Sequence, residues 1–117
     1  MAVENVFASV AVKDLGIAEA WYSKLLGQSP SKPMPEVLEW KLAGGGGLQV
    51  YRLPERAGHG SLTLAVRDLD AEISKLEAMG ADTSERPSST RVRTVMVTDP
   101  DGNHVALAEA FDALLLR

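Results

Sequence analysis

The order of apolar and polar residues predicts a strand followed by a helix at two places in the chain. Residues 5–12 and 61–66 alternate with period two, which is typical of strands with one buried face. Each is followed by a segment with apolar residues at helical spacing. These residues are Leu15, Ala18, Tyr22, Leu25 and Leu26 in the first segment, and Leu69, Ile73, Leu76 and Met79 in the second. Asp14 and Asp68 are placed to cap the two helices, and Gly27 and Gly80 to end them.

The two halves of the chain repeat one pattern. Val10-Ala-Val-Lys-Asp-Leu15 recurs as Leu64-Ala-Val-Arg-Asp-Leu69, in each case before a predicted helix. Each half then continues through a glycine-bearing turn into a further strand, over residues 44–53 in the first half and 99–110 in the second. We therefore expect one supersecondary unit used twice, with a strand, a helix and then strands in a meander.

The remaining segments predict hairpins and irregular connections. Residues 91–98 and 104–110 flank Asp99-Pro-Asp-Gly-Asn103, a sequence that favours a tight turn between antiparallel strands. Residues 36–43 and 48–53 are predicted strands on either side of Gly44–Gly47. The proline-containing residues 28–35 are expected to form a loop or an irregular edge strand, and residues 81–90 have little regular pattern. The leucine-rich tail, residues 111–117, is expected to dock on this chain or on a neighbour.

Length and composition bound the class of protein. A chain of 117 residues fits a single compact domain, which we divide into module one (about 5–53), a linker (54–58), module two (59–110) and the tail. Cysteine is absent, so neither disulfides nor thiolate metal sites are possible.

The charge balance also narrows the expected partners. Twelve Lys and Arg stand against sixteen Asp and Glu, for a net charge of −4, and the basic residues form no cluster. Nucleic acid and membrane are therefore not expected partners, because both require clustered positive charge. The sequence has no apolar run of the ~20 residues that span a membrane, and no basic start before an apolar block. A cytoplasmic location is expected.

Several motifs together resemble a known family. They are the first Val-Lys-Asp-Leu, the helix carrying Trp21-Tyr22-Ser-Lys-Leu-Leu-Gly27, the second Val-Arg-Asp-Leu and the closing Asp-Pro-Asp-Gly-Asn103. In this order they resemble the vicinal oxygen chelate superfamily, from about Asn5 to Glu109. That superfamily includes glyoxalase I, bleomycin resistance proteins, extradiol dioxygenases and fosfomycin resistance enzymes. The resemblance implies an α+β fold in which two βαβββ modules form a curved mixed sheet around a cleft, with the helices on the outer face.

The resemblance also implies where a metal would be bound. Metal-dependent members carry His or Glu ligands near the start of the first strand and in the last strand of each module. Aligned on the motifs of this chain, these positions hold Phe7, Gln49, Ser61 and Ala106. A divalent cation prefers carboxylate or imidazole ligands. No metal and no other cofactor are therefore expected.

Two histidines leave an alternative open. His59 and His104 lie two residues before Ser61 and Ala106, so each shares a strand face with its neighbour. A relocated metal site at these histidines would need a third ligand, and none lies at the matching parity.

Other catalytic chemistry finds little support. Neither Ser9 nor Ser61 has a visible partner base, and no cysteine is present. Gly44–Gly47 lacks the Lys-Ser/Thr that follows the glycines of a phosphate-binding loop, and is interpreted as a turn. No catalytic residue is predicted.

The expected cleft combines apolar and aromatic residues with a few hydrogen-bonding groups, which is typical of a small-molecule pocket. The candidate ligand-binding residues are Phe7, Ser9, Trp40, Gln49, Tyr51, Ser61, Thr63, His104 and Ala106. Trp40 has two interpretations, a core tryptophan or a platform for a ligand.

The leading hypothesis is a metal-independent protein of the glyoxalase/bleomycin resistance type that binds an aromatic or amphiphilic small molecule, with antibiotic sequestration as one use. The alternative is a glyoxalase-like lyase, isomerase or dioxygenase with relocated metal ligands. A third hypothesis is that the pocket is vestigial and that the protein acts by association with another chain. A homodimer is expected, and the modules could pair within a chain or between chains.

Overall fold

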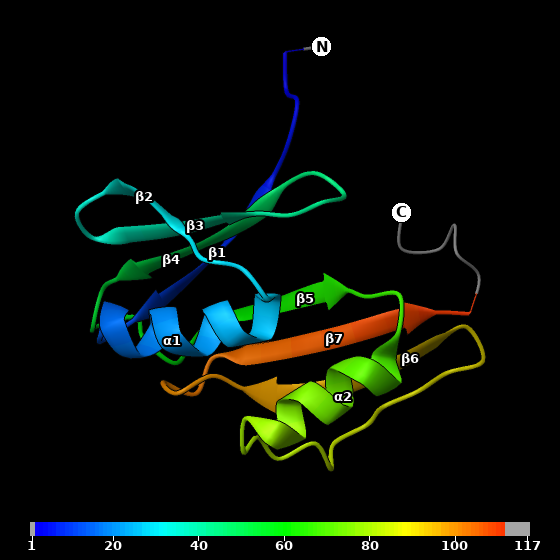
Figure 1. Cartoon of the computed structure of the whole chain (residues 1–117). Helices are drawn as coiled ribbons and strands as arrows, with labels where there is room; N and C mark the ends of the chain where they lie inside the picture. Colours follow the sequence, from blue (N-terminus) through cyan, green and yellow to red (C-terminus); the bar gives the residue numbers. More distant parts are fainter. Residues whose placement is uncertain (1, 112–117) are drawn as a thin grey trace. The chain divides into compact units, whose positions relative to one another are not determined.

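Over its described residues, the protein has an α+β fold built from two mixed sheets and two helices (Figure 1). The structure is a computed structural model that describes residues 2–111. The elements in chain order are β1 (Phe7–Val12), α1 (Leu15–Leu26), β2 (Ser31–Met34), β3 (Val37–Lys41), β4 (Gly47–Arg52), β5 (Ser61–Ala65), α2 (Leu69–Ala78), β6 (Val92–Thr98) and β7 (His104–Ala110). The strand orders are β1-β4-β3-β2 and β5-β7-β6. The predicted α+β class is confirmed.

The described residues form two compact units. Unit 1 contains residues 2–60 together with 99–103, and unit 2 contains residues 61–98 and 104–111. The boundary at residues 60 and 61 lies close to the start predicted for module two. The turn at residues 99–103 belongs to unit 1, although the strands on either side of it belong to unit 2.

In unit 1, one face of the sheet and helix α1 form the core. β1 is parallel to β4, and β4 is antiparallel to β3. The buried residues of this sheet face are Val10, Val12, Leu38, Trp40, Leu48 and Val50, and those of α1 are Ala18, Tyr22 and Leu25. Asp14 caps α1 by accepting a hydrogen bond from the Ile17 amide at 3.0 Å, and the helix ends at Gly27 with a φ of 69°. Both predicted ends of α1 are confirmed.

A buried polar cluster ties the turn at residues 99–103 into unit 1. The Asp99 carboxylate, which is 4% exposed, accepts hydrogen bonds from Tyr22 Oη at 2.7 Å and from Asn103 Nδ2 at 2.8 Å. Asn103 Nδ2 also donates to the carbonyl of Ala11, and its Oδ1 accepts from the amide of Gly60. Burial, and next the charge of Asp99, raise the pKa of Tyr22 well above its usual value.

Unit 2 repeats the plan with aliphatic residues. Its sheet buries Leu62, Val95, Val97, Val105 and Leu107, and α2 buries Leu69, Ile73 and Leu76. Asp68 caps α2 by accepting from the Ala71 amide at 3.1 Å, as predicted. The Leu69 amide donates to Glu109 Oε1 on β7 at 2.7 Å, so the first turn of α2 is fixed at both a cap and a strand.

The second module lacks one of the strands that the βαβββ pattern predicted. Between α2 and β6 the described residues form no regular strand. Residues 85–89 instead run beside β6, with the amides of Met96 and Thr94 donating to the carbonyls of Glu85 and Pro87 at 2.8 and 3.1 Å. Because Pro87 has no N–H, it cannot complete a regular ladder. The prediction of a second βαβββ module is corrected here to βαββ with an irregular edge.

The other differences from prediction are small. β1 begins at Phe7 rather than Asn5, and residues 31–34 of the proline-rich segment do form the edge strand β2. Of the leucine-rich tail, only Phe111 lies within the described residues, and its side chain is exposed. Among the residues that the structure describes, neither helix is long and apolar enough to cross a membrane.

Candidate functional site

Four of the predicted ligand-binding residues lie on one face of the sheet in unit 1. The parallel register of β1 and β4 pairs Ser9 with Gln49, and places Phe7 two residues before Ser9 and Tyr51 two residues after Gln49. Since side chains alternate along a strand, all four point away from the face that packs on α1. We call Phe7, Ser9, Gln49 and Tyr51 the unit 1 face.

A row of hydrogen bonds crosses the unit 1 face. Ser9 Oγ donates to Gln49 Oε1 at 3.5 Å, and Gln49 Nε2 donates to Glu39 Oε1 on β3 at 2.9 Å. A carboxylate can only accept, so Glu39 requires the NH₂ end of the Gln49 amide to face it. The carbonyl end of the amide is then turned towards Ser9. Glu39 was not among the predicted site residues, because its role depends on a contact between strands that the sequence does not specify.

The phenyl ring of Phe7 depends on a neighbouring glycine. A Cβ at Gly47, the register partner of Phe7, would lie 2.6 Å from a ring carbon of Phe7. This distance is too short for any real side chain, so glycine at this position allows the ring to lie over β4. The ring thereby contributes apolar surface to the unit 1 face.

Trp40 does not belong to this face. It pairs with Leu48 on the core side of the sheet, where its side chain is 1% exposed. Its indole Nε1 donates to the carbonyl of Gln28 at 2.9 Å, and its ring lies 6.0 Å from that of Tyr22. The interpretation of Trp40 as a ligand platform is therefore wrong, because the register of β3 turns the residue into the core.

The other four predicted residues lie on one face of the sheet in unit 2. The register pairs Ser61 with His104 and Thr63 with Ala106, and across β7 it pairs Thr98 with His104 and Met96 with Ala106. Ser61, Thr63 and His104 are exposed, while Ala106 is buried. We call Ser61, Thr63, His104 and Ala106 the unit 2 face.

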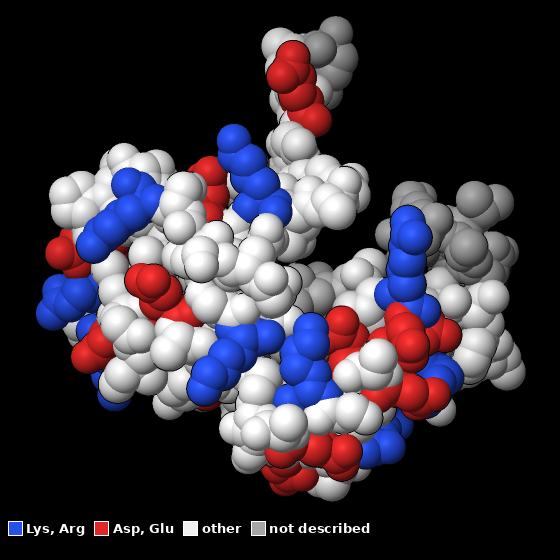
Figure 2. Space-filling view, in the orientation of Figure 1, with Lys and Arg blue, Asp and Glu red and all other residues white. Residues whose placement is uncertain are grey.

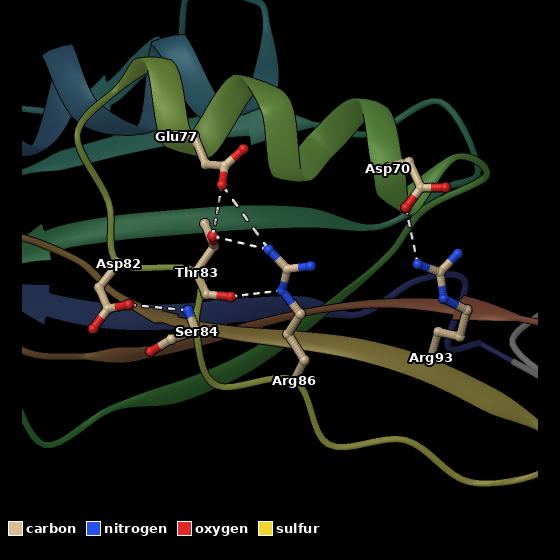
Figure 3. Close-up of polar contacts among 7 residues, drawn as sticks. All are labelled: Asp70, Glu77, Asp82, Thr83, Ser84, Arg86 and Arg93. Carbon is tan, nitrogen blue, oxygen red and sulfur yellow. Dashed lines mark hydrogen bonds and ion pairs between the residues drawn. The ribbon is translucent and has the colours of Figure 1, made fainter.

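His104 also lines a small cavity. The cavity has a volume of about 180 Å³, and its lining residues are Asp82, Ser84, Glu85, Met96, Val97, Thr98 and His104. Hydrogen bonds from the side chain and the backbone of Ser84 hold the pKa of Asp82 below its usual range. Figure 3 shows the bond from the backbone amide, at 2.9 Å. The sequence did not point to the residues from 82–85, because this segment carries no periodic pattern that would place it beside β6.

The residues at the family's metal positions do not fit a divalent cation. Phe7 and Ala106 have no donor atoms, and Gln49 and Ser61 offer an amide and a hydroxyl. Over residues 2–111, no group of three or more His, Asp or Glu side chains is arranged to hold a metal ion. Of the two histidines considered as relocated ligands, His59 belongs to unit 1 and His104 to unit 2.

Charges of both signs are interspersed on the face of the molecule that Figure 2 shows. In the view of Figure 2, Lys and Arg alternate with Asp and Glu rather than forming one continuous patch. Two ion pairs connect α2 to other parts of unit 2. Arg93 pairs with Asp70 at 2.9 Å, and Arg86 pairs with Glu77 at 4.0 Å. The hydrogen bond and charge of Arg93 lower the pKa of Asp70.

The structure is similar to several solved proteins. A glyoxalase/bleomycin resistance protein from Catenulispora acidiphila is 40% identical, with a TM-score of 0.80 and coverage of 92% of this chain and 98% of that chain. TnmS3, an antibiotic binding protein from Streptomyces sp. CB03234, is 26% identical, with a TM-score of 0.81 and coverage of 94% and 98%. A lactoylglutathione lyase from Agrobacterium tumefaciens shares the fold at 18% identity, with a TM-score of 0.76 and coverage of 93% and 95%.

The sequence itself also matches a family. No curated protein sequence matches the chain. The model of the glyoxalase-like domain matches residues 7–108, which span every strand and both helices from β1 to the middle of β7. The same region carries the duplicated motifs that resemble the vicinal oxygen chelate superfamily. The chain belongs to the glyoxalase-like domain family, within the vicinal oxygen chelate superfamily.

Proposed function

We propose that this protein binds an aromatic or amphiphilic small molecule without a metal. The observation that carries the proposal is the chemistry at the four family metal positions, where Phe7, Gln49, Ser61 and Ala106 supply a phenyl ring, an amide, a hydroxyl and a methyl group. These groups suit an organic ligand better than a cation, because they offer apolar surface and a few directional hydrogen bonds.

The unit 1 face provides the most complete set of such groups. Phe7 and Tyr51 offer ring surface for an aromatic group of the ligand. Between them, the Ser9 hydroxyl and the Gln49 amide are held in position by the row of hydrogen bonds that ends at Glu39. A preorganised polar group loses less conformational entropy when a ligand binds, which favours affinity.

Sequestration of an antibiotic is the use that we propose for this binding. The fold is shared with TnmS3, an antibiotic binding protein, and with a glyoxalase/bleomycin resistance protein at 40% identity. A binding protein of this kind lowers the free concentration of the drug and needs no catalytic group. The Ser9 hydroxyl donates to the Gln49 amide rather than to a base, so the proposal assigns no nucleophile.

Thermal unfolding with candidate ligands tests the proposal. Bleomycin and a planar polycyclic aromatic antibiotic are added to the full-length protein, and a ligand that prefers the folded state must raise the Tm. Gln49→Leu and Ser9→Ala are expected to weaken binding by about tenfold, as for the loss of one directional hydrogen bond. Ser74→Ala, at an exposed position on α2, is the matched control and is expected to bind as the parent does.

The alternative is an enzyme, a lyase, isomerase or dioxygenase that uses other metal ligands. Metal analysis of the purified protein separates this alternative from the proposal. One equivalent of Ni, Zn, Fe or Mn that survives dialysis would favour the enzyme. Substoichiometric metal together with a ligand-dependent rise in Tm is the expected result. A Tm unmoved by both antibiotic classes would reject sequestration of those classes.

We also propose that the protein is a homodimer. Apolar side chains that are exposed on unit 1, among them Val6 at 78% and Met34 at 58%, would gain from being covered by a second copy. Light scattering of the purified protein is expected to give twice the mass of the 12.5 kDa chain. A single species at the mass of one chain would reject the dimer.

A further inference from the structure

Unit 2 contains a second and larger cavity, which the candidate faces do not explain. Its volume is about 330 Å³, at the lower end of the range for small-molecule sites. The lining residues are Arg86, Ser88, Ser89, Arg93, Thr94 and Phe111. Two of these six side chains are cationic, three carry hydroxyl groups, one is aromatic and none is acidic. Of these six lining residues, only Thr94 lies on the sheet face that carries Ala106 of the unit 2 face.

The local backbone holds the hydroxyl of Ser89 as a hydrogen-bond donor. Ser89 Oγ accepts hydrogen bonds from the amides of Arg91 and Val92 at 3.1 and 3.2 Å. These two bonds occupy the acceptor capacity of the hydroxyl, so its O–H is left to donate. The turn itself is closed by the Ser89 amide, which donates to the carbonyl of Val92 at 3.0 Å.

The two guanidinium groups are each held by neighbouring residues and keep further donors. Arg93 Nη2 bonds to Asp70 at 2.9 Å, while Arg86 Nε and Nη2 donate to the carbonyl and the hydroxyl of Thr83 at 2.7 and 3.2 Å (Figure 3). A guanidinium has five N–H donors, so these bonds leave donors on both groups. The side chains of Arg86 and Arg93 are 49% and 36% exposed, which leaves them accessible to a ligand.

Phe111 adds an apolar wall next to these donors. Its amide donates to the carbonyl of Arg91 at 2.9 Å, which fixes the residue beside the turn at residues 89–92. Its side chain is 57% exposed, so the ring presents uncovered apolar surface. A ligand that contacts this ring would gain from removing that surface from water.

We propose that this cavity binds an oxyanion carried on an aromatic ring, such as an aromatic carboxylate or a phosphate monoester. The anion contacts the guanidinium groups of Arg86 and Arg93 and the hydroxyl of Ser89. Arginine suits this role because its planar donors match the geometry of carboxylate and phosphate oxygens. The aromatic ring of the ligand packs against Phe111.

Backbone amide chemical shifts of the full-length protein provide the test. Phenyl phosphate, benzoate and inorganic phosphate are titrated separately, and shifts are expected at residues 88–94 and at Phe111. Comparison of the Kd values for benzoate and phenyl phosphate shows whether the cavity prefers a carboxylate or a phosphate. Inorganic phosphate is expected to bind more weakly than phenyl phosphate, since it cannot contact the ring. Benzylamine, which has the ring but the opposite charge, is expected to leave these shifts unchanged.

Two variants break the same ion pair but differ in their expected effect on binding. Arg93→Gln removes a cation from the cavity and is expected to raise the Kd for phenyl phosphate by about tenfold. Asp70→Asn removes the carboxylate that competes for Arg93, and is expected to lower the Kd or leave it unchanged. Both variants lose the ion pair between α2 and β6, so a merely structural effect would change the Kd in the same direction.

Further variants complete the design. Arg86→Gln is expected to weaken binding as Arg93→Gln does, and Arg67→Gln, an exposed arginine of unit 2 outside the cavity, is the matched control. If none of the three anions shifts the amides of residues 88–94, the proposal is wrong. It is equally wrong if Arg67→Gln weakens binding as much as the two cavity variants do, because the anion would then respond only to net charge.

Discussion

The two modules of this chain make the same hairpin turn with different side chains. Residues 42–46 connect β3 to β4, and residues 99–103 connect β6 to β7. In each turn the first amide donates to the carbonyl of the fifth residue, at 3.1 Å in the first turn and 2.9 Å in the second. The fourth residue of each is a glycine with positive φ, 99° at Gly45 and 93° at Gly102. The backbone of the turn is therefore part of the repeated plan.

What differs is how each turn is held. The first turn is largely glycine and contributes few side-chain contacts, although a Cβ at Gly46 would lie 2.6 Å from the carbonyl oxygen of Val6. The second turn carries Asp99 and Asn103, which are almost completely buried in the polar cluster around Tyr22. The comparison shows that one repeated backbone can accept two kinds of packing, a permissive loop and a fixed anchor.

The same contrast extends to the cores. Trp40 and Leu48 form the second residue pair beyond the first turn, and Val97 and Val105 form the second residue pair beyond the second turn. Both residues are buried, but among the residues that the structure describes only the first core contains large aromatic side chains.

Replacement of the two matched core residues should give the largest difference between the modules. Trp40→Ala is expected to lower the free energy of unfolding by about 3–5 kcal/mol, because it leaves a large cavity. Val97→Ala removes two methylene equivalents and is expected to cost about 2 kcal/mol. Urea unfolding followed by far-UV circular dichroism measures both, independently of the tryptophan signal. Equal losses would mean that the aromatic core of module one adds no stability of its own.

The polar anchor of the second turn predicts the next effect. Tyr22→Phe removes a donor from a buried carboxylate and is expected to cost about 1.5–3 kcal/mol, as for hydrogen bonds to charged groups. Tyr51→Phe, on the unit 1 face, is the matched control and is expected to change stability by less than about 0.5 kcal/mol. A neutral effect of Tyr22→Phe would show that the anchor does not depend on this bond.

The pKa of Tyr22 predicts how stability depends on alkaline pH. The unfolded chain releases the tyrosine proton near the usual pKa of about 10, whereas the folded protein retains it because the pKa of Tyr22 is raised. Stability is thus fully present below about pH 10 and falls above it, by up to about 1.4 kcal/mol per pH unit. Urea midpoints between about pH 9 and 11 should decline less steeply in Tyr22→Phe than in the parent. If the urea midpoints of the parent and of Tyr22→Phe declined in parallel, the raised pKa of Tyr22 would be contradicted.

The glycines of the two turns should give the smallest effects and the closest match. Gly45→Ala and Gly102→Ala each force a residue with a Cβ into positive φ, at an expected cost of about 1 kcal/mol. No neighbouring atom would clash with either Cβ, since the nearest contact is 3.8 Å at Gly45 and none lies within 4 Å at Gly102. Chemical denaturation of the two variants compares the costs. A clearly larger loss at one position would show that the turns are less alike than their hydrogen bonds indicate.

Periodicity and capping residues were sufficient to predict most of the fold. The sites of both helices, the two hairpins and the faces of β1, β4, β5 and β7 follow from signals within each segment. The irregular edge at residues 85–89 could not be predicted, because its position depends on hydrogen bonds to β6 that a polar segment does not encode.

The candidate site was predicted less completely than the fold. The side of Trp40 depends on the register between β3 and β4, which its own strand does not determine. Glu39 reaches the unit 1 face, and Asp82, Ser84 and Glu85 line the smaller cavity, through contacts between elements distant in sequence. Residues read from strand parity alone, such as Ser9 and Gln49, were placed on the expected face.

The prolines at the outer strands bear on how the molecule resists aggregation. Pro33 lies in β2, the last strand of the first sheet, and Pro87 lies in the segment that borders β6 in the second. A proline interrupts the row of amide donors that a foreign strand would need in order to extend a sheet. The β2 edge of the first sheet and the β6 edge of the second are therefore poorly suited to recruit another polypeptide. This should help the protein to remain dispersed when it is abundant.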